Sequence, residues 1–476
     1  MSVAGVGAFQ VVAMASTLLR SKIVAVSLGP AGVGAIALLD QIVILGSQIC
    51  VLGMTSASTK FLAAAHSDGE EPFAHAYTTF LRIVILLSVV GVAGTALFLQ
   101  LSVPAVDLMG FAAVVALAIL PLNGIPTIQN AMAASQRVRA AATYGLATTV
   151  VLSLVSAGAT AWDGLRGYYI GTLGALLAVF AGGAWYMRRV RTGSSWLQNP
   201  LADLTRYRTA AGSAAVMYMS SLSAPVADLI PRYVITQTQT LEATGLLQAA
   251  FGIALAVRNV VRPSFALFLT PTLNRRTPPA QKLRDAAAFT RVMLTLTTIM
   301  ALLIVLYPSF WLATLYTSKF VAVAPWVFLF LFAITVQQIG AVYVALLFAL
   351  EELRLFVLIA VGGDILTCVV TALMVPTFGI PAVAIGLLAD GVVLCVASEW
   401  LLRRRHRLNL TRAAGPLTIV TLASILGLGA AVPTGPVTLV GALIRGALWV
   451  VISLALLAWL QRTPASAPES NPGPAV

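Results

Sequence analysis

The feature that most constrains this chain is a succession of long apolar runs separated by short segments that carry arginine. The runs are about 18 to 28 residues long, and a helix needs about 20 apolar residues to cross a bilayer. Membrane-barrel strands would be about 10 residues long and alternate in polarity. Because lipid leaves backbone polar groups unsatisfied, a spanning segment must be a helix or part of a closed barrel. The sequence therefore predicts an all-α polytopic membrane protein.

The composition agrees, because 59% of the 476 residues are hydrophobic and only 9% are charged. A soluble domain carries about 25% charged residues. We predict fourteen spans, N- and C-termini in the cytoplasm, and boundaries at 4–27, 33–54, 78–101, 107–132, 141–161, 166–187, 208–231, 242–268, 290–315, 322–349, 354–375, 380–402, 414–432 and 438–460.

The basic residues support this orientation. With a cytoplasmic N-terminus, 20 lysines and arginines fall on the cytoplasmic side and only Arg166, Arg232 and Lys319 on the other. The net charge of +13 is therefore read as a topology signal rather than as a nucleic-acid site. The cytoplasmic set is Lys60, Arg137, Arg139, Arg188, Arg189, Arg191, Arg206, Arg208, Arg275, Arg276, Lys282, Arg284, Arg291, Arg354, Arg403, Arg404, Arg405, Arg407, Arg412 and Arg462.

The longest basic segment divides the first twelve spans into two sets of six that start on the same side, which predicts a parallel repeat. The segments AGVGAIALL (31–39) and EATGLLQAA (242–250) are a weak echo of that repeat. We expect an N-terminal six-helix lobe (1–195), a C-terminal six-helix lobe (196–407), two additional helices (408–462) and a disordered tail (463–476).

The chain carries none of the patterns that mark nucleotide sites, serine hydrolases or zinc proteases. Its cysteines lie in apolar spans without metal-ligand spacing, and they read as packing residues. We therefore expect no cofactor, no metal and no enzymatic activity, and transport that does not use ATP bound to this chain.

Ionisable residues at membrane depth are functional candidates by default, because each costs about 2.5–3.5 kcal/mol to insert. Glu399 near the basic end of its helix is expected to form a surface pair, and Arg445 to extend toward the interface or lipid. The candidates are Arg20, Lys22, Asp40, Asp228, Arg232, Arg258, Arg262, Asp364 and Asp390.

Spans 1, 2, 7 and 8 would line a central cleft if two lobes enclose one. Arg258 and Arg262 are four residues apart and share one helix face, whereas Arg20 and Lys22 diverge by roughly 160°. That divergence predicts one side chain in the cleft and one extended outward. Because arginine matches paired phosphate oxygens, such a cationic cleft favours an anionic, phosphate-bearing amphiphile.

The same residues also permit structural roles. Arg20 or Lys22 could pair with Asp40 or Asp228 only to position helices, and Arg258 and Arg262 could do the same. Arg232 could be an interfacial residue. Asp364 and Asp390 could form structural pairs or take part in coupling-ion or proton chemistry.

Three segments carry a resemblance to a known family: AVSLGPAGVG (25–34), followed by Gln41 and Thr59-Lys60; APVA (224–227), followed by Arg232, Gly245, Gln248 and LTPTLNR (269–275); and PTFGIPAVAIG (376–386). Together they resemble the O-antigen and enterobacterial common antigen translocases of the multidrug/oligosaccharidyl-lipid/polysaccharide exporter superfamily, over most of residues 1–407. The third segment also resembles the glycine turn found before span 12 across the superfamily.

The resemblance implies two six-helix lobes in a V, alternating access, and a polyprenyl-diphosphate-linked oligosaccharide as substrate. It also implies a bacterial inner membrane, surrounding lipids, and partnership with a polysaccharide polymerase and chain-length machinery. Lys22 matches a basic residue of the translocases' first helix. Arg20 and Asp40 resemble positions of the related lipid II flippases, and Arg232 matches the arginine after the PVA motif.

The leading hypothesis is a flippase for lipopolysaccharide or other polysaccharide biosynthesis, such as O-antigen. Translocases usually have twelve spans, whereas fourteen is typical of lipid II flippases and some polysaccharide exporters, so a lipid II flippase is an alternative. A multidrug exporter is another, although such exporters favour acidic cavities. A membrane-embedded glycosyltransferase or polymerase is a further alternative, but it would need a large external loop, and the predicted external loops are short. The last alternative is a purely structural membrane partner.

Overall fold

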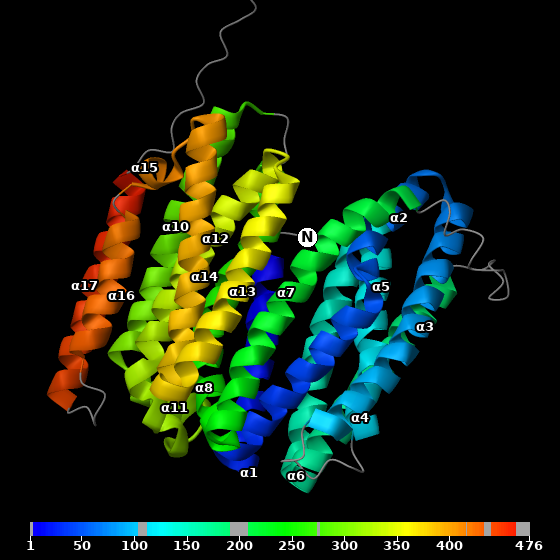
Figure 1. The fold of residues 1–476 in the computed structure, drawn as a ribbon, viewed down its shortest axis with the longest axis horizontal. Coiled ribbons are helices and arrows are strands. Elements are labelled where there is room, and N and C mark those ends of the chain that lie inside the picture. Colours follow the sequence, from blue (N-terminus) through cyan, green and yellow to red (C-terminus); the bar gives the residue numbers. More distant parts are fainter. Residues whose placement is uncertain are drawn as a thin grey trace, which may run out of the picture. The chain divides into compact units, whose positions relative to one another are not determined.

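The computed structural model describes residues 3–102, 112–190, 208–273, 277–415, 417–432 and 439–462, and every regular element within them is a helix (Figure 1). Two compact units form. Unit 1 contains Met1–Gln248 and Thr314–Phe320, and unit 2 contains Ala249–Ala313 and Val321–Val476. The division between these units lies inside a helix, so the predicted lobes, which meet at 195/196, stay a prediction. The tail that begins at residue 463 lies outside the described residues.

Unit 1 is built from seven helices and the start of an eighth: α1 (Val3–Val51), α2 (Met54–Ser67), α3 (Glu70–Ser102), α4 (Ala112–Leu117), α5 (Ile119–Ala134), α6 (Val138–Val190), α7 (Arg208–Thr238) and α8 (Leu241–Ser264). Non-helical backbone at Gly29 (φ 65°) and at Gly164 (φ 59°) breaks α1 and α6. Positive φ suits glycine, which has no Cβ, and Pro30 then restarts the helix with its fixed φ.

Unit 2 continues α8 and adds α9 (Thr270–Leu273), α10 (Pro279–Leu306), α11 (Pro308–Leu315), α12 (Val327–Ala349), α13 (Leu353–Phe378), α14 (Ile380–Leu401), α15 (Leu410–Ala414), α16 (Leu417–Ala431) and α17 (Leu439–Arg462). Three irregular turns, η1 (Phe265–Leu269), η2 (Ser318–Trp326) and η3 (Leu402–His406), join or extend them. The end of α11 and the start of η2 belong to unit 1. Gly379 (φ 65°) ends α13 and opens α14, which confirms the glycine turn that its motif predicts.

Ten helices within the described residues are long and apolar enough to cross a membrane. Two of them, Val12–Val51 and Arg139–Arg188, have 40 and 50 residues, and the breaks at Gly29 and Gly164 leave each with enough length for two crossings. The chain is thus a multi-pass membrane protein. Fourteen crossings and cytoplasmic termini stay predictions.

The helix α2 lies in a segment where no element was predicted. Its residue Leu62 is fully buried and packs in a cluster with Phe73, Phe80, Ile128 and Met187 of α3, α5 and α6. A prediction based on spans misses such a helix, because its apolar face is shorter than a bilayer crossing.

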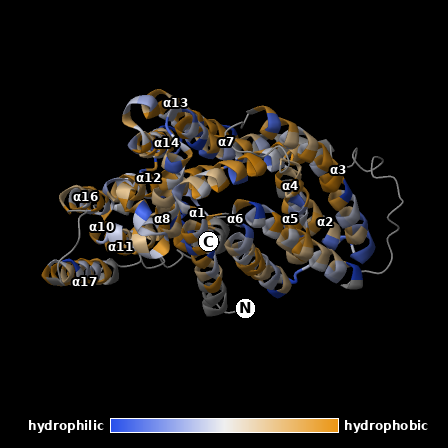
Figure 2. Cartoon of the chain, turned by 90° about the horizontal axis from the view of Figure 1, so that it is seen from below, coloured by the Kyte–Doolittle hydropathy of each residue, from blue (hydrophilic) through white to orange (hydrophobic). Residues whose placement is uncertain are grey.

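Large apolar side chains also remain on the outside of both units. Along α17, Leu443, Val451 and Leu454 are each more than 60% exposed, as are Val90 and Leu101 of α3. Figure 2 shows the corresponding hydrophobic colouring along the helices. A soluble monomer does not expose apolar surface on this scale, so these faces are the surfaces that lipid covers.

The added helix α17 is fixed to the end of α10 by three side chains that donate to backbone carbonyls. Arg445 Nη1 reaches the Leu306 oxygen at 2.9 Å, Trp449 Nε1 reaches Ile299 at 2.9 Å, and the Tyr307 hydroxyl reaches Ala442 at 2.6 Å. Arg445 therefore contacts a helix-end carbonyl of the protein, and its expected extension toward the interface or lipid stays a prediction. A carbonyl at a helix end lacks an intrahelical partner, so it offers a better site for the guanidinium.

A buried polar hub joins three helices of unit 1. Asn123 of α5 accepts from Ser47 Oγ at 2.5 Å and donates to Ser88 Oγ at 3.0 Å, and its side chain is almost inaccessible. Removing one partner leaves the others buried and unsatisfied, which costs about 1–3 kcal/mol.

Replacing Asn123 by alanine is accordingly expected to lower the free energy of unfolding by about 1–3 kcal/mol. Thermal unfolding of the purified protein in detergent measures this. The control is Asn259→Ala, because Asn259 is exposed and its loss should matter little. Equal melting temperatures for the two variants would contradict the role of the hub.

Candidate functional site

The charged side chains of the first helix form a partly buried polar cluster in unit 1. Asp40 is half-buried in the second part of α1, and its Oδ2 accepts a 2.8 Å hydrogen bond from the Tyr168 hydroxyl of α6. Tyr168 packs edge-on against Tyr169 with 5.1 Å between ring centroids, and both tyrosines interact electrostatically with the carboxylate. Arg20 adds an opposite charge that acts on Asp40.

Lys22 lies with Arg20 in the first part of α1, before the break at Gly29, and its Nζ donates to the backbone carbonyl of Tyr316. Arg20 also interacts with Tyr316, so both cations reach the Thr314–Phe320 segment. The prediction that one of the two extends outward stays a prediction, although both side chains reach this segment. Burial raises the pKa of Tyr316 to about 12, and the positive charge of Arg20 acts in the opposite direction. Its hydroxyl is therefore neutral at physiological pH.

Arg232 is the most buried cation of the cluster, with 6% of its surface exposed. Its guanidinium donates to Gln248 Oε1 at 3.0 and 3.3 Å and to the carbonyl oxygen of Asp228 one turn earlier. Asp228 and Asp40 both interact with it electrostatically. Arg232 therefore packs inside the protein, and whether it lies at the membrane interface stays a prediction.

Two of these cations donate hydrogen bonds to neutral oxygens. The acceptors of Lys22 and Arg232 include an amide oxygen and backbone carbonyls, which are neutral. Such partners solvate a positive charge without cancelling it. Three cations against Asp40 and Asp228 leave unit 1 with one positive charge in excess at this cluster, which favours an anion as the exchangeable ligand.

A close backbone contact supports this cluster. A Cβ at Gly34 would collide with the Leu241 carbonyl and the Gly245 nitrogen, and one at Gly245 would collide with the Pro30 carbonyl and the Gly34 nitrogen. The contact is reciprocal, because each glycine faces the residue four positions before the other. It joins the two segments of the sequence echo, and it brings α1 against the α7–α8 turn that follows Arg232.

The remaining predicted site residues belong to unit 2. Arg258 is half-buried in α8, and Arg262 lies one turn further along the same helix, with a side chain outside the described residues. The structure thus places both arginines on one helix. Their predicted participation in a cavity with Arg20, Lys22 and Arg232 stays a prediction.

Asp390 of α14 is buried, and its Oδ2 accepts a 2.6 Å hydrogen bond from Gln337 of α12. Asp364 of α13 interacts with it electrostatically, and Gly363 leaves the space that Asp390 occupies. The two carboxylates are therefore brought together. Within the described residues, no group of three or more His, Cys, Asp or Glu side chains has the arrangement of a metal site.

Sequence reasoning missed Tyr168 and Gln337, which donate hydrogen bonds to Asp40 and Asp390, and Tyr169, which interacts with Asp40 electrostatically. Tyr168 lies 128 positions from Asp40, and no local pattern connects them. The only signal in the sequence was indirect, since a buried carboxylate requires a donor.

The fold and the site together define a class. The described residues form an all-helical, multi-pass membrane protein that encloses cationic and acidic side chains, and ionisable residues within membrane spans mark functional sites. No protein-family model matches the chain.

Comparison with known proteins then narrows the class. The chain is 26% identical over 406 residues to the lipid III flippases of Escherichia coli and Shigella flexneri, covering 82% of this chain and 95% of each relative. Among solved structures it resembles the lipid II flippase MurJ in an inward closed conformation, with a TM-score of 0.68, 12% identity, and coverage of 95% and 97%. It also resembles an inward-facing MATE multidrug transporter, with a TM-score of 0.56, 14% identity, and coverage of 88% and 99%.

These likenesses establish a MurJ- and MATE-like fold and support a flippase of the multidrug/oligosaccharidyl-lipid/polysaccharide exporter superfamily. The narrower family of O-antigen and enterobacterial common antigen translocases stays a prediction.

Proposed function

We propose that this protein flips a polyprenyl-diphosphate-linked oligosaccharide across the bacterial inner membrane for polysaccharide biosynthesis. The observation that carries the proposal is the cluster of Arg20, Lys22 and Arg232 inside a transporter fold, where neutral oxygens accept hydrogen bonds from Lys22 and Arg232. The likeness to lipid III flippases over nearly their whole length supports the same substrate class.

In the proposed cycle the diphosphate replaces neutral partners of the cationic side chains. Its oxygens take the place of Gln248 and the Tyr316 carbonyl, because a charged acceptor binds a guanidinium or ammonium about twice as strongly as a neutral one. The sugars occupy the aqueous cleft and the polyprenyl tail stays between helices in lipid. Asp364 and Asp390 are proposed as coupling or positioning carboxylates, and no covalent chemistry is involved.

A lipid II flippase is the second candidate, and the observation that favours it is the MurJ-like fold over 95% of the chain. A multidrug exporter is less well supported. The MATE-like fold permits it, but exporters of cationic drugs require an acidic cavity, and the cluster in unit 1 carries excess positive charge.

The deciding experiment is lipid profiling with leaflet sidedness in a deletion strain. We expect an oligosaccharide on polyprenyl diphosphate to accumulate on the cytoplasmic leaflet and to be cleared by the wild-type gene. Accumulated lipid II with cell lysis would favour the second candidate, and a change in drug sensitivity alone would overturn both.

Arg258 and Arg262 provide a residue-level test. The double alanine variant is expected to reduce complementation at least tenfold, because two charge-assisted phosphate contacts each contribute about 1.5–3 kcal/mol. Membrane insertion, measured by the amount of folded protein in detergent, should be preserved. The control is Arg139→Ala, at an exposed position in the first turn of α6. Full activity of the double variant would exclude these arginines from substrate binding.

A further inference from the structure

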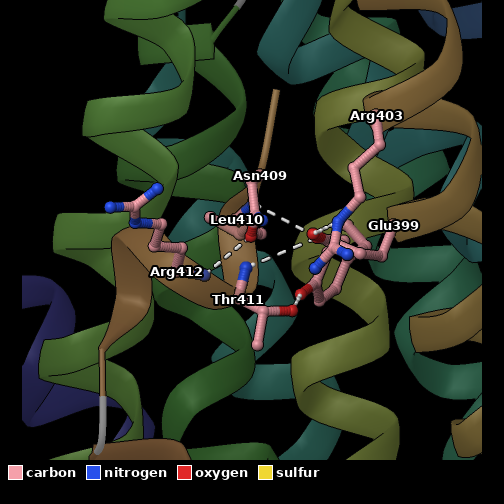
Figure 3. Close-up of polar contacts among 7 residues, drawn as sticks. Glu399, Arg403, Asn409, Leu410, Thr411 and Arg412 are labelled. Atoms are coloured by element: carbon pink, nitrogen blue, oxygen red, sulfur yellow. Dashed lines mark hydrogen bonds and ion pairs between the residues drawn. The ribbon is translucent and has the colours of Figure 1, made fainter. Parts of the chain in front are cut away.

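The segment that follows α14 is held firmly by one buried carboxylate. Glu399 has 8% of its surface exposed, and its Oε2 accepts from the backbone nitrogens of Leu410 and Thr411 at 3.2 and 3.4 Å (Figure 3). Its Oε1 accepts from Arg403 Nε at 2.6 Å. The expected surface pair exists, but the expected exposure of Glu399 was wrong, since the carboxylate joins the end of α14 to the start of α15.

Further contacts fix the same segment. Leu408 donates its backbone N–H to the Leu402 carbonyl at 3.1 Å, and Leu402, Leu408 and Leu410 are all buried in the core of unit 2. Asn409 accepts from the Arg412 backbone nitrogen at 2.8 Å and caps α15. A segment anchored in this way loses little conformational entropy when it binds a partner.

The outward face of this segment is strongly basic. Five arginines between residues 403 and 412 are exposed, and the carboxylates that pair with them are Glu399 for Arg403 and Glu352 for Arg405 at 2.9 Å. Five positive charges against two carboxylates leave an excess of three. We call the five residues the arginine platform: Arg403, Arg404, Arg405, Arg407 and Arg412.

A tryptophan marks the level of the platform in the membrane. Trp400 is 54% exposed, and the Arg404 guanidinium lies 5.1 Å from its ring centroid. Tryptophan is enriched where the hydrocarbon meets the headgroups, and the distribution of charge predicts that this end of α14 is cytoplasmic. The cytoplasmic leaflet is the one that carries anionic lipid.

We propose that the arginine platform binds the headgroups of anionic phospholipids. The guanidinium fork matches paired phosphate oxygens, and Trp400 holds the fork at headgroup depth. A role in orienting the chain would need only positive charge on this side. It would not need a buried glutamate that fixes where the arginines lie, and this difference separates binding from orientation.

The test uses the purified full-length protein in nanodiscs with increasing fractions of brominated phosphatidylglycerol in phosphatidylcholine. Quenching of Trp400, isolated by subtracting the signal of Trp400→Phe, reports the anionic lipid beside the platform. The triple variant R404Q/R407Q/R412Q is expected to need at least tenfold more phosphatidylglycerol for half-quenching, since each arginine removed costs about fivefold.

Two further variants separate charge from placement. Glu399→Gln retains every arginine but loses the anchoring charge, and it should shift half-quenching in the same direction by a smaller factor. The matched control R137Q/R139Q removes two exposed arginines elsewhere and should leave the curve unchanged.

Equal quenching of the triple variant and the wild type would overturn the proposal, as would equal quenching by brominated phosphatidylcholine. Lost activity in cells with unaltered lipid binding would assign the platform to an acidic protein partner and would likewise overturn it. Because lipid is measured without substrate, these outcomes are independent of the proposed transport activity.

Discussion

Alanine in place of Gly245 is expected to destabilise the protein and to abolish transport. The added Cβ would collide with the Pro30 carbonyl oxygen and the Gly34 nitrogen, and backbone atoms cannot rotate away as a side chain does. Overpacking of this kind costs about 1–3 kcal/mol or more. The variant should therefore melt at a lower temperature in detergent and fail to complement a deletion strain.

The expected loss of stability is opposite to the effect that alanine normally has in a helix, so it is specific to the close contact. Alanine is favoured over glycine inside a helix by about 1 kcal/mol, so a glycine without neighbours should tolerate the change. Gly174 is such a position, since a Cβ there would meet nothing within 4 Å. We expect Gly174→Ala to melt at or above the wild-type temperature and to transport normally. A Gly245→Ala variant as stable as Gly174→Ala would show that α1 and the α7–α8 turn do not need their close contact.

The reciprocal glycine contact also shows which features of the fold the sequence predicts and which it does not. The echo between 31–39 and 242–250 marked both glycines as matching positions. Nothing in that echo indicated that the two segments touch, because contact depends on how helices pack rather than on their order. Similarly, apolar length located most spans, and the PTFGIP motif located the turn at Gly379.

Partners of the buried charges were harder to predict. Hydropathy identified Asp40 and Asp390 as unusual but could not supply Tyr168 or Gln337, since hydroxyl and amide groups are common in membrane helices. Glu399 was assigned to the surface because arginines follow it in sequence. Its carboxylate instead turns inward to two backbone nitrogens, a choice that only the fold of α15 creates.

The other large effect concerns Arg20 and Asp40, for which the sequence left two interpretations open. If the two residues only position helices, removing one leaves an uncompensated buried charge, which costs about 3–5 kcal/mol. Removing both should then restore stability and transport together. If Arg20 also binds the diphosphate, the double variant regains stability alone.

We expect the second result. Arg20→Gln and Asp40→Asn should each lower the melting temperature and reduce flipping of a lipid-linked oligosaccharide in proteoliposomes at least tenfold. The double variant R20Q/D40N should melt near the wild type and remain inactive, because no cation is left at that position for the diphosphate. Asp285→Asn, in an exposed hydrogen bond with Gln281, controls for the loss of a carboxylate and should change neither quantity. Recovered flipping in the double variant would reduce the pair to a structural bridge and would shift substrate binding to Lys22, Arg232 and the arginines of α8.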